Sequence, residues 1–230
     1  MKRSLVLLSE ISIVAATTIG AGMFALPYAF HRVGWGFSLL FLFLLTMGVS
    51  LSHVIYWRVL ESGGGRGLLG LVREAYPRSS FLAFVSIAGG LILTLVVYLI
   101  LGGGFLGLLG LKWHPFFSIL IFWAASSFPI VLGTKRLGVV ETFGTLAMIA
   151  IIFVIFFGGG SVATSSGAYR TGGDVLLLFS GLLFSLAGWT AVEPIWEMRK
   201  RLDPEERATF PWAGLVLGTV LSAVIYLVFV

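Results

Sequence analysis

The residues best suited to chemistry lie in the first apolar segment, where residues 17–27 read Thr-Thr-Ile-Gly-Ala-Gly-Met-Phe-Ala-Leu-Pro. A helix in lipid must satisfy its own backbone groups, so glycine and proline at membrane depth predict an interrupted helix. An interruption at Ile19–Gly22 would expose amides at the start of the second half-helix and carbonyls at the end of the first. The amides suit a carboxylate, and the carbonyls suit an ammonium group or a monovalent cation. The segment therefore predicts a site for a zwitterion, to which Thr17 and Thr18 add hydroxyl groups.

Two simpler interpretations of the same residues stay open. Glycine and alanine in a membrane helix commonly serve close helix packing, and threonine side chains commonly bond back to carbonyls of their own helix. Neither interpretation explains why two threonines, two glycines and a proline gather within residues 17–27. Interrupted membrane helices are also the best pointer from sequence to the substrate site of a transporter.

A second apolar segment carries a similar interruption. Residues 187–192 read Ala-Gly-Trp-Thr-Ala-Val, against Ala-Gly-Met-Phe-Ala-Leu at residues 21–26, so that three of six positions are identical. So short a match of small residues also arises by chance, but the first copy lies in a span predicted to run from inside to outside and the second in a span predicted to run from outside to inside. The correspondence predicts an inverted repeat of five helices, in which an interrupted helix opens each copy.

Composition defines the class of protein that must position these residues. Hydrophobic residues make up 58% and charged residues 11% of the chain, and the mean hydropathy is +1.05. Soluble domains carry about 25% charged residues, so the chain is predicted to be an integral membrane protein. With no cysteine and three isolated histidines, it offers no disulfide, no thiolate and no metal-ligand spacing. No cofactor and no enzymatic site are expected.

Seven apolar spans, each close to the roughly 20 residues that cross a bilayer, organise the chain. They lie near residues 10–30, 36–57, 81–101, 116–133, 138–157, 175–195 and 211–230. With the N-terminus in the cytoplasm, 12 of the 15 Lys and Arg residues fall on the cytoplasmic side and 3 on the other. This bias predicts a cytoplasmic N-terminus in the cell membrane. It accounts for the net charge of +5 without nucleic acid, and it argues against a seven-helix receptor, which usually has its N-terminus outside.

The connections between spans are short and carry two local predictions. Residues 63–65 are three glycines and form a flexible point, after which a short surface helix is expected near Leu68–Ala75. Asp203-Pro204-Glu205-Glu206 is typical of a helix start, with Asp as the cap and Pro in the first turn. Residues 158–173 form a polar external loop rich in Gly, Ser and Thr.

Three segments together carry a resemblance to a known family. Residues 16–27 resemble the first-helix signature of the hydroxy/aromatic amino acid permeases, a branch of the amino acid–polyamine–organocation superfamily with the LeuT-type fold. Residues 184–189, Phe-Ser-Leu-Ala-Gly-Trp, are similar to the sixth-helix pattern of that superfamily. Residues 207–213 are similar to its pattern at the start of helix seven. The likeness covers nearly the whole chain.

The resemblance implies roles for particular residues. The backbone at Ile19–Met23 would hold the substrate carboxylate and ammonium, carbonyls near Ser185–Gly188 would share the ammonium, and Phe184 would be an aromatic gate. Phe184 is alternatively one more packing aromatic, and Trp189 either stacks on an aromatic substrate or packs at the break. The candidate substrate-binding residues are Thr17, Thr18, Ile19, Gly20, Ala21, Gly22, Met23, Phe184, Ser185, Ala187, Gly188 and Trp189.

The chain departs from the family's pattern in length. Such permeases generally have ten or more spans, so residues 1–157 would be a complete first repeat and residues 174–230 a partial second repeat. A fragment or truncated product is therefore expected, and the alternative function is a non-transporting half-permease that acts as a binding or assembly subunit. A homo- or hetero-oligomer would then supply the missing helices.

Ionisable residues near the spans are the candidates for ion coupling. An intramembrane carboxylate is a functional candidate by default, and Glu193, one turn beyond the second break, is the preferred proton carrier. Its equally weighted alternative is a pair with Arg199 or Lys200. Glu10 is expected to pair with Lys2 or Arg3, Glu141 to be structural, and His53 to be a polar contact between helices.

These observations predict an all-α, multi-pass bundle with the LeuT-type inverted repeat and interrupted helices one and six. The chain forms one transmembrane domain, residues 1–230. The expected function is secondary active transport of an amino acid, with aromatic or large neutral side chains favoured, by alternating access. The driving gradient is H+ or Na+, and the expected partners are the amino acid and the lipid bilayer.

Overall fold

The computed structural model describes residues 3–108, 113–131, 172–207 and 209–230, and every regular element in these residues is helical. The first part contains α1 (Arg3–Thr18), the 3₁₀ helix η1 (Ala21–Ala25), α2 (Leu26–Val33), α3 (Trp35–Ser62) and α4 (Leu68–Ala75). Next come η2 (Pro77–Ser79), α5 (Ser80–Leu108) and α6 (Pro115–Val131). The last part contains α8 (Gly172–Leu186), η3 (Trp189–Ala191), α9 (Val192–Arg199), α10 (Pro204–Arg207) and α11 (Trp212–Phe229).

Four stretches in the described residues are long and apolar enough to cross a membrane: Trp35–Ser62, Pro77–Gly107, Gly172–Arg199 and Trp212–Phe229. A fifth span is formed if Ser4–Thr18 and Gly22–Val33, which are bent by 56° at their junction, cross together. Pro115–Phe128 is a shorter apolar helix. The predicted span at 138–157 and the loop at 158–173 lie outside the described residues but for 172–173, so the number of seven spans stays a prediction. The multi-pass helical fold class is confirmed.

The helices form two compact units. The first contains α1, η1, α2, α3, the start of α4 as far as Leu71, and α8 to α11. The second contains α5 and α6, where Gly103 of α5 lets α6 approach closely. A Cβ at Gly103 would lie 2.8 Å from Cγ1 of Ile119.

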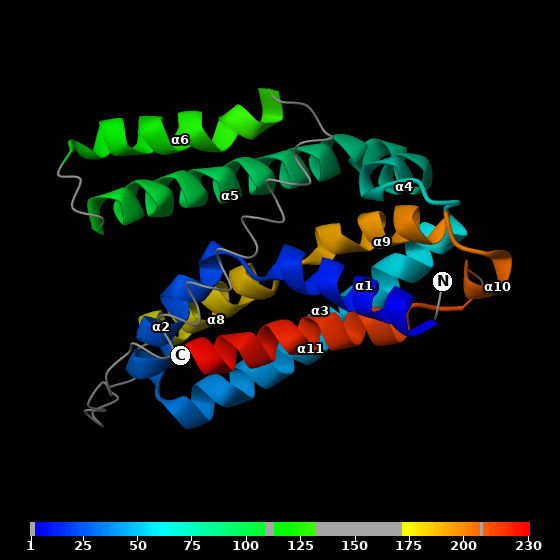
Figure 1. The fold of residues 1–230 in the computed structure, drawn as a ribbon, viewed down its shortest axis with the longest axis horizontal. Coiled ribbons are helices and arrows are strands. Elements are labelled where there is room, and N and C mark those ends of the chain that lie inside the picture. The colour runs from blue at the N-terminus through cyan, green and yellow to red at the C-terminus, as the bar shows by residue number, and fades with distance from the viewer. Residues whose placement is uncertain (1–2, 109–112, 132–171, 208) are drawn as a thin grey trace. The chain divides into compact units, whose positions relative to one another are not determined.

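In the first unit, α11 packs along α1 and α3, while α8 packs against α2 and α3 (Figure 1). Small residues of α11 allow its contact with α1, because a Cβ at Gly218 would lie 2.5 Å from Cβ of Val14. Large apolar side chains fill the space between the other helices, as burial of apolar area favours. The largest fully buried ones include Tyr226, Phe30, Met23, Leu26, Leu60, Leu178, Leu182, Leu186, Ile195, Leu215 and Val14.

Both local predictions for the connections are confirmed. The short helix α4 spans Leu68–Ala75, and α10 begins at Pro204. The glycine run before α4 is used for its backbone freedom, since Gly64 and Gly65 have φ values of 66° and 82°.

Candidate functional site

The first interruption lies at Ile19 and Gly20, between α1 and η1. The amide of Ile19 still donates to the Ala15 carbonyl at 2.8 Å, but Gly20 is extended, with φ −145° and ψ −168°. Helical hydrogen bonding resumes at η1, where the Met23 amide donates to the Gly20 carbonyl at 3.2 Å. Within the described residues, the amides of Gly20 and Gly22 have no hydrogen-bond acceptor. The second half-helix therefore begins with free donors, as the glycines predict.

The second interruption lies at Ala187 and Gly188, between α8 and η3. The Gly188 amide donates to the Leu186 carbonyl at 2.7 Å, and the Ala191 amide donates to the Gly188 carbonyl at 2.9 Å. Gly188 has φ −98° and ψ 20°, which ends the α-helical ladder before η3 restarts it.

The two interruptions lie against each other, and each glycine faces a hydroxyl residue of the other break. A Cβ added at Gly22 would lie 2.6 Å from Oγ of Ser185 and 2.8 Å from Cδ1 of Phe184. A Cβ added at Gly188 would clash with Oγ1 of Thr18. We call the two interruptions and these reciprocal contacts the paired breaks; the contacting residues are at least 162 positions apart in the sequence. Five of the predicted site residues therefore share one place in the fold.

Tyr226 of α11 joins the two breaks, and no local pattern in the sequence indicates this role. Its hydroxyl is 2.8 Å from the Thr18 carbonyl and 2.6 Å from the Ser185 carbonyl. Both carbonyls stand at the ends of half-helices, where the intrahelical ladder leaves acceptors unused. Tyr226 is completely buried. One side chain thus holds the C-terminal ends of α1 and α8 together.

The remaining predicted site residues are distributed around the paired breaks. The Thr18 hydroxyl is buried and has no hydrogen-bond partner in the described part of the chain. Thr17 is exposed and donates to the Ile13 carbonyl at 2.7 Å, so its hydroxyl serves its own helix as the simpler interpretation expects. Trp189 packs edge-on against Tyr56, with ring centres 6.2 Å apart. Ile19 and Met23 are buried, Ala187 is exposed, and the Ala21 side chain lies outside the description.

Glu193 lies half-buried on α9, where it holds the beginning of α4. The Tyr56 hydroxyl donates to its Oε1 at 2.5 Å, and the Leu68 amide donates to the same oxygen at 3.3 Å. The predicted alternative pair with Arg199 or Lys200 is wrong. Arg199 bonds to Glu10, and Lys200 bonds to Glu197 at 2.7 Å. The reason is that α9 turns Glu193 toward α3 rather than toward its own basic end.

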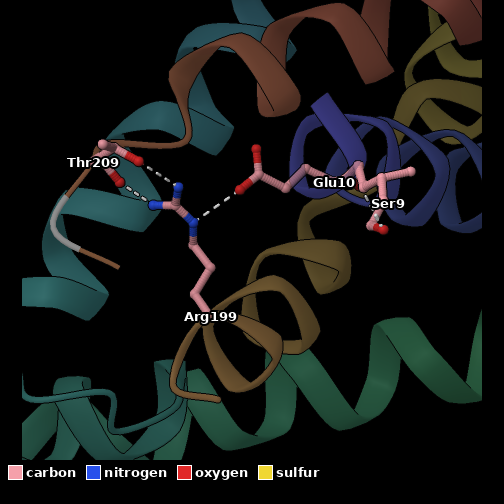
Figure 2. Close-up of polar contacts among 5 residues, drawn as sticks. Ser9, Glu10, Arg199 and Thr209 are labelled. Carbon is pink, nitrogen blue, oxygen red and sulfur yellow. Dashed lines mark hydrogen bonds and ion pairs between the residues drawn. The ribbon is translucent and has the colours of Figure 1, made fainter. Parts of the chain in front are cut away.

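A buried ion pair connects α1 with α9. Figure 2 shows the Arg199 guanidinium between Glu10 on one side and Thr209 on the other. Its Nε donates to Oε1 of Glu10 at 2.8 Å, its Nη2 donates to Oγ1 of Thr209 at 2.9 Å, and its Nη1 donates to the Thr209 carbonyl. The side chains of Arg199 and Glu10 are 5% and 3% exposed. Glu10 therefore pairs with a residue far along the chain, and the predicted pair with Lys2 or Arg3 lies outside the side chains that the structure describes.

A second ion pair lies at the other end of these helices. Nε of Arg32, near the end of α2, donates to Oδ1 of Asp174, in the first turn of α8, at 2.9 Å. The first interrupted helix is α1 with α2, and the second is α8 with α9. The start of the first (Glu10) contacts the end of the second (Arg199), and the end of the first (Arg32) contacts the start of the second (Asp174). The two interrupted helices therefore run in opposite directions. Their middles meet at the paired breaks. Within the described residues, no group of His, Asp and Glu could hold a metal ion.

Two antiparallel interrupted helices that meet at their breaks, inside a bundle of membrane-length helices, define an integral membrane protein of the transporter class. The sequence model of the tryptophan/tyrosine permease family matches residues 3–229, and the chain belongs to this family. The predicted kinship with aromatic amino acid permeases is thereby confirmed. This is a family of amino acid transporters, not of enzymes. No curated protein and no solved structure matches the chain.

Proposed function

We propose that the chain carries an aromatic or large neutral amino acid across the cell membrane by alternating access, with the paired breaks as its binding site. The observation that carries this proposal is the contact of Gly22 with Ser185 and of Gly188 with Thr18. This contact brings free amides and half-helix carbonyls to one place. Free amides at a helix start favour a carboxylate, and carbonyls at a helix end favour an ammonium.

The site supplies polarity without placing an unpaired charge in the membrane. The amides of Gly20 and Gly22 would receive the carboxylate, carbonyls from residues 185–188 would receive the ammonium, and the Thr18 hydroxyl would add a donor. Phe184 and Trp189 would contact the substrate side chain, and their aromatic surfaces favour an aromatic or large apolar group. The antiparallel course of the interrupted helices supports the LeuT-type inverted repeat.

Transport against a concentration difference requires a coupled ion, and the two candidates are H+ and Na+. Orientation follows the distribution of Lys and Arg, with the N-terminus in the cytoplasm. Glu193 is the residue that the sequence favours as a proton carrier. Its bonds to Tyr56 and to the Leu68 amide would link its protonation state to the docking of α4 on α9.

Uptake by the purified chain in proteoliposomes tests the proposal. Labelled tryptophan, tyrosine, phenylalanine and leucine are supplied with no gradient, with an imposed pH gradient and with an imposed sodium gradient. We expect saturable uptake that one gradient drives, and competition by the other substrates in order of their affinity. If inserted, folded protein shows neither uptake nor exchange of any amino acid, the proposal fails.

A further inference from the structure

A buried histidine lies between α3 and α11, outside the proposed binding site. His53 is 1% exposed, and its Nδ1 lies 3.0 Å from Oγ1 of Thr219. The expectation that His53 is a polar contact between helices is confirmed. Its Nε2 is also buried, and among the described residues it has no hydrogen-bond partner.

The Thr219 hydroxyl bears on the tautomer of His53. It has a single proton, and its oxygen lies 2.9 Å from the Leu215 carbonyl and 3.0 Å from Nδ1 of His53. When that proton is donated to the Leu215 carbonyl, as is common for threonine in a helix, the oxygen accepts a hydrogen bond from a protonated Nδ1. Nε2 is then an unprotonated acceptor inside the bundle, without a donor in the described part of the chain.

Three acidic groups on the interrupted helices already have polar partners. Glu10 is bonded to Arg199, Asp174 to Arg32, and Glu193 to Tyr56. Proton coupling needs a group that can change its charge when the structure changes. An imidazole can gain a proton when its surroundings change, and Nε2 of His53 has no hydrogen-bond partner among the described residues.

The surroundings of His53 are those of the helices packed against α3, which are α11, α8, α2, α9 and η3. The titratable or charged residues on those elements and on the neighbouring turns of α3 are Tyr226, Asp174, Tyr28, His31, Arg32, Glu193, Glu197, Arg199, Tyr56, Arg58 and Glu61. Among the bonds that the structure gives for these residues, none involves His53. In the described residues, an imidazolium at His53 would therefore lack an acceptor at Nε2.

We propose that His53 is the proton-accepting residue that couples transport to a proton gradient, an inference that rests on the proposed transport function. In the packed arrangement His53 is neutral, because an unpaired buried charge is strongly disfavoured. Protonation at Nε2 requires that α3 and α11 separate enough for water or another acceptor to reach the ring. The proton and the relative position of these helices are thereby linked.

The link reaches the binding site through α11. Thr219 and Tyr226 are seven residues apart on one face of that helix, a rise of about 10 Å. Tyr226 bonds to both half-helix ends at the paired breaks. A shift of α11 that opens the His53 environment therefore also moves the hydroxyl that holds the breaks together.

His53→Asn tests the coupling role. Asparagine can still donate to Thr219 but cannot accept a proton in this pH range. The matched control is His31→Asn, since His31 is exposed on α2. In proteoliposomes, the two measurements are exchange of labelled tryptophan without any gradient, and accumulation driven by a pH gradient.

We expect His53→Asn to retain exchange and to lose accumulation driven by the pH gradient, while His31→Asn retains both. Accumulation by His53→Asn at the wild-type ratio, or wild-type accumulation that follows sodium and ignores the pH gradient, overturns the coupling role. Absence of exchange in the wild type would instead count against the proposed transport function itself.

A spectroscopic measurement decides the question even if His53→Asn does not fold. The chain has three histidines, so in the double variant His31→Asn/His114→Asn the remaining imidazole signal belongs to His53. With ¹⁵N-labelled histidine, we expect the neutral form protonated at Nδ1, which becomes an imidazolium on acidification at a pH that shifts when tryptophan is added. A signal that stays neutral throughout, or a titration that ignores tryptophan, overturns the proposal.

Discussion

At the scale of single residues, the missing side chain at Gly22 allows the two breaks to touch. Replacing Gly22 with alanine would place its Cβ 2.6 Å from Oγ and 2.9 Å from Cα of Ser185. Part of this obstacle is backbone, so the helices must move apart. We expect a loss of about 1–3 kcal/mol of stability together with loss of amino acid binding. Thermal unfolding with and without tryptophan measures both effects.

The control for Gly22→Ala is Gly48→Ala on α3, where an added Cβ meets no atom within 4 Å. Alanine favours a helix over glycine by about 1 kcal/mol, so this variant should be as stable as the wild type or more stable. Stabilisation by tryptophan should persist in Gly48→Ala. If Gly22→Ala behaves in the same way as this control, the paired breaks are not the binding site.

The role of a residue can be predicted from sequence when that role depends on its immediate neighbours in the chain. The two interruptions were predicted because glycine weakens a helix locally, and both breaks fall at glycines, Gly20 and Gly188. Tyr226 was missed because it is a single tyrosine in an apolar run, and its partners are chosen by the way α11 lies against α1 and α8. Arg199 was not recognised as the partner of Glu10 for the same reason, since the two residues are separated by 189 positions.

At the scale of elements, the pair of Glu10 and Arg199 fastens α1 to α9 and, through Thr209, to the connection before α11. Removing one member leaves the other charge buried and unpaired. We therefore expect Glu10→Gln or Arg199→Met to cost about 3–5 kcal/mol of stability. The double variant should cost less than the sum of the two, because neither charge is then left alone. Unfolding by denaturant of all four proteins measures the coupling.

An exposed ion pair at the end of the same helix provides the comparison. Lys200 and Glu197 are 46% and 60% exposed, with 2.7 Å between the paired atoms. Surface pairs contribute about 0–1 kcal/mol, so Glu197→Gln should leave stability nearly unchanged. Equal losses for Glu10→Gln and Glu197→Gln would show that burial adds nothing to the Glu10–Arg199 pair.

Helix boundaries were easier to predict than helix partners. The start of α10 at Pro204 and the limits of α4 follow from turn and cap residues that act over a few positions. Helix-to-helix contacts in a membrane depend on the rotation of each helix about its axis. A nearly uniform apolar sequence does not encode that rotation, because lipid and protein neighbours are equally apolar.

At the scale of the whole molecule, the distribution of Lys and Arg predicts that the N-terminus is cytoplasmic. The chain contains no cysteine, so a single introduced cysteine reports its own side of the membrane. Glu61, near the end of α3, and His114, before α6, are both exposed. We expect an impermeant thiol reagent to label His114→Cys in intact cells and Glu61→Cys only after permeabilisation. The reverse pattern would contradict the orientation.

The reciprocal contacts at the paired breaks have a consequence for how this sequence can diverge. Ser185 occupies the space beside Gly22, and Thr18 occupies the space beside Gly188. A larger side chain at one position requires a smaller one at the position it faces. We therefore expect these positions to be substituted together during evolution rather than one at a time. Homologues that enlarge residue 22 should shrink residue 185, and the same exchange should link residues 188 and 18. Substitutions in two distant stretches of the gene are thereby expected to be coupled.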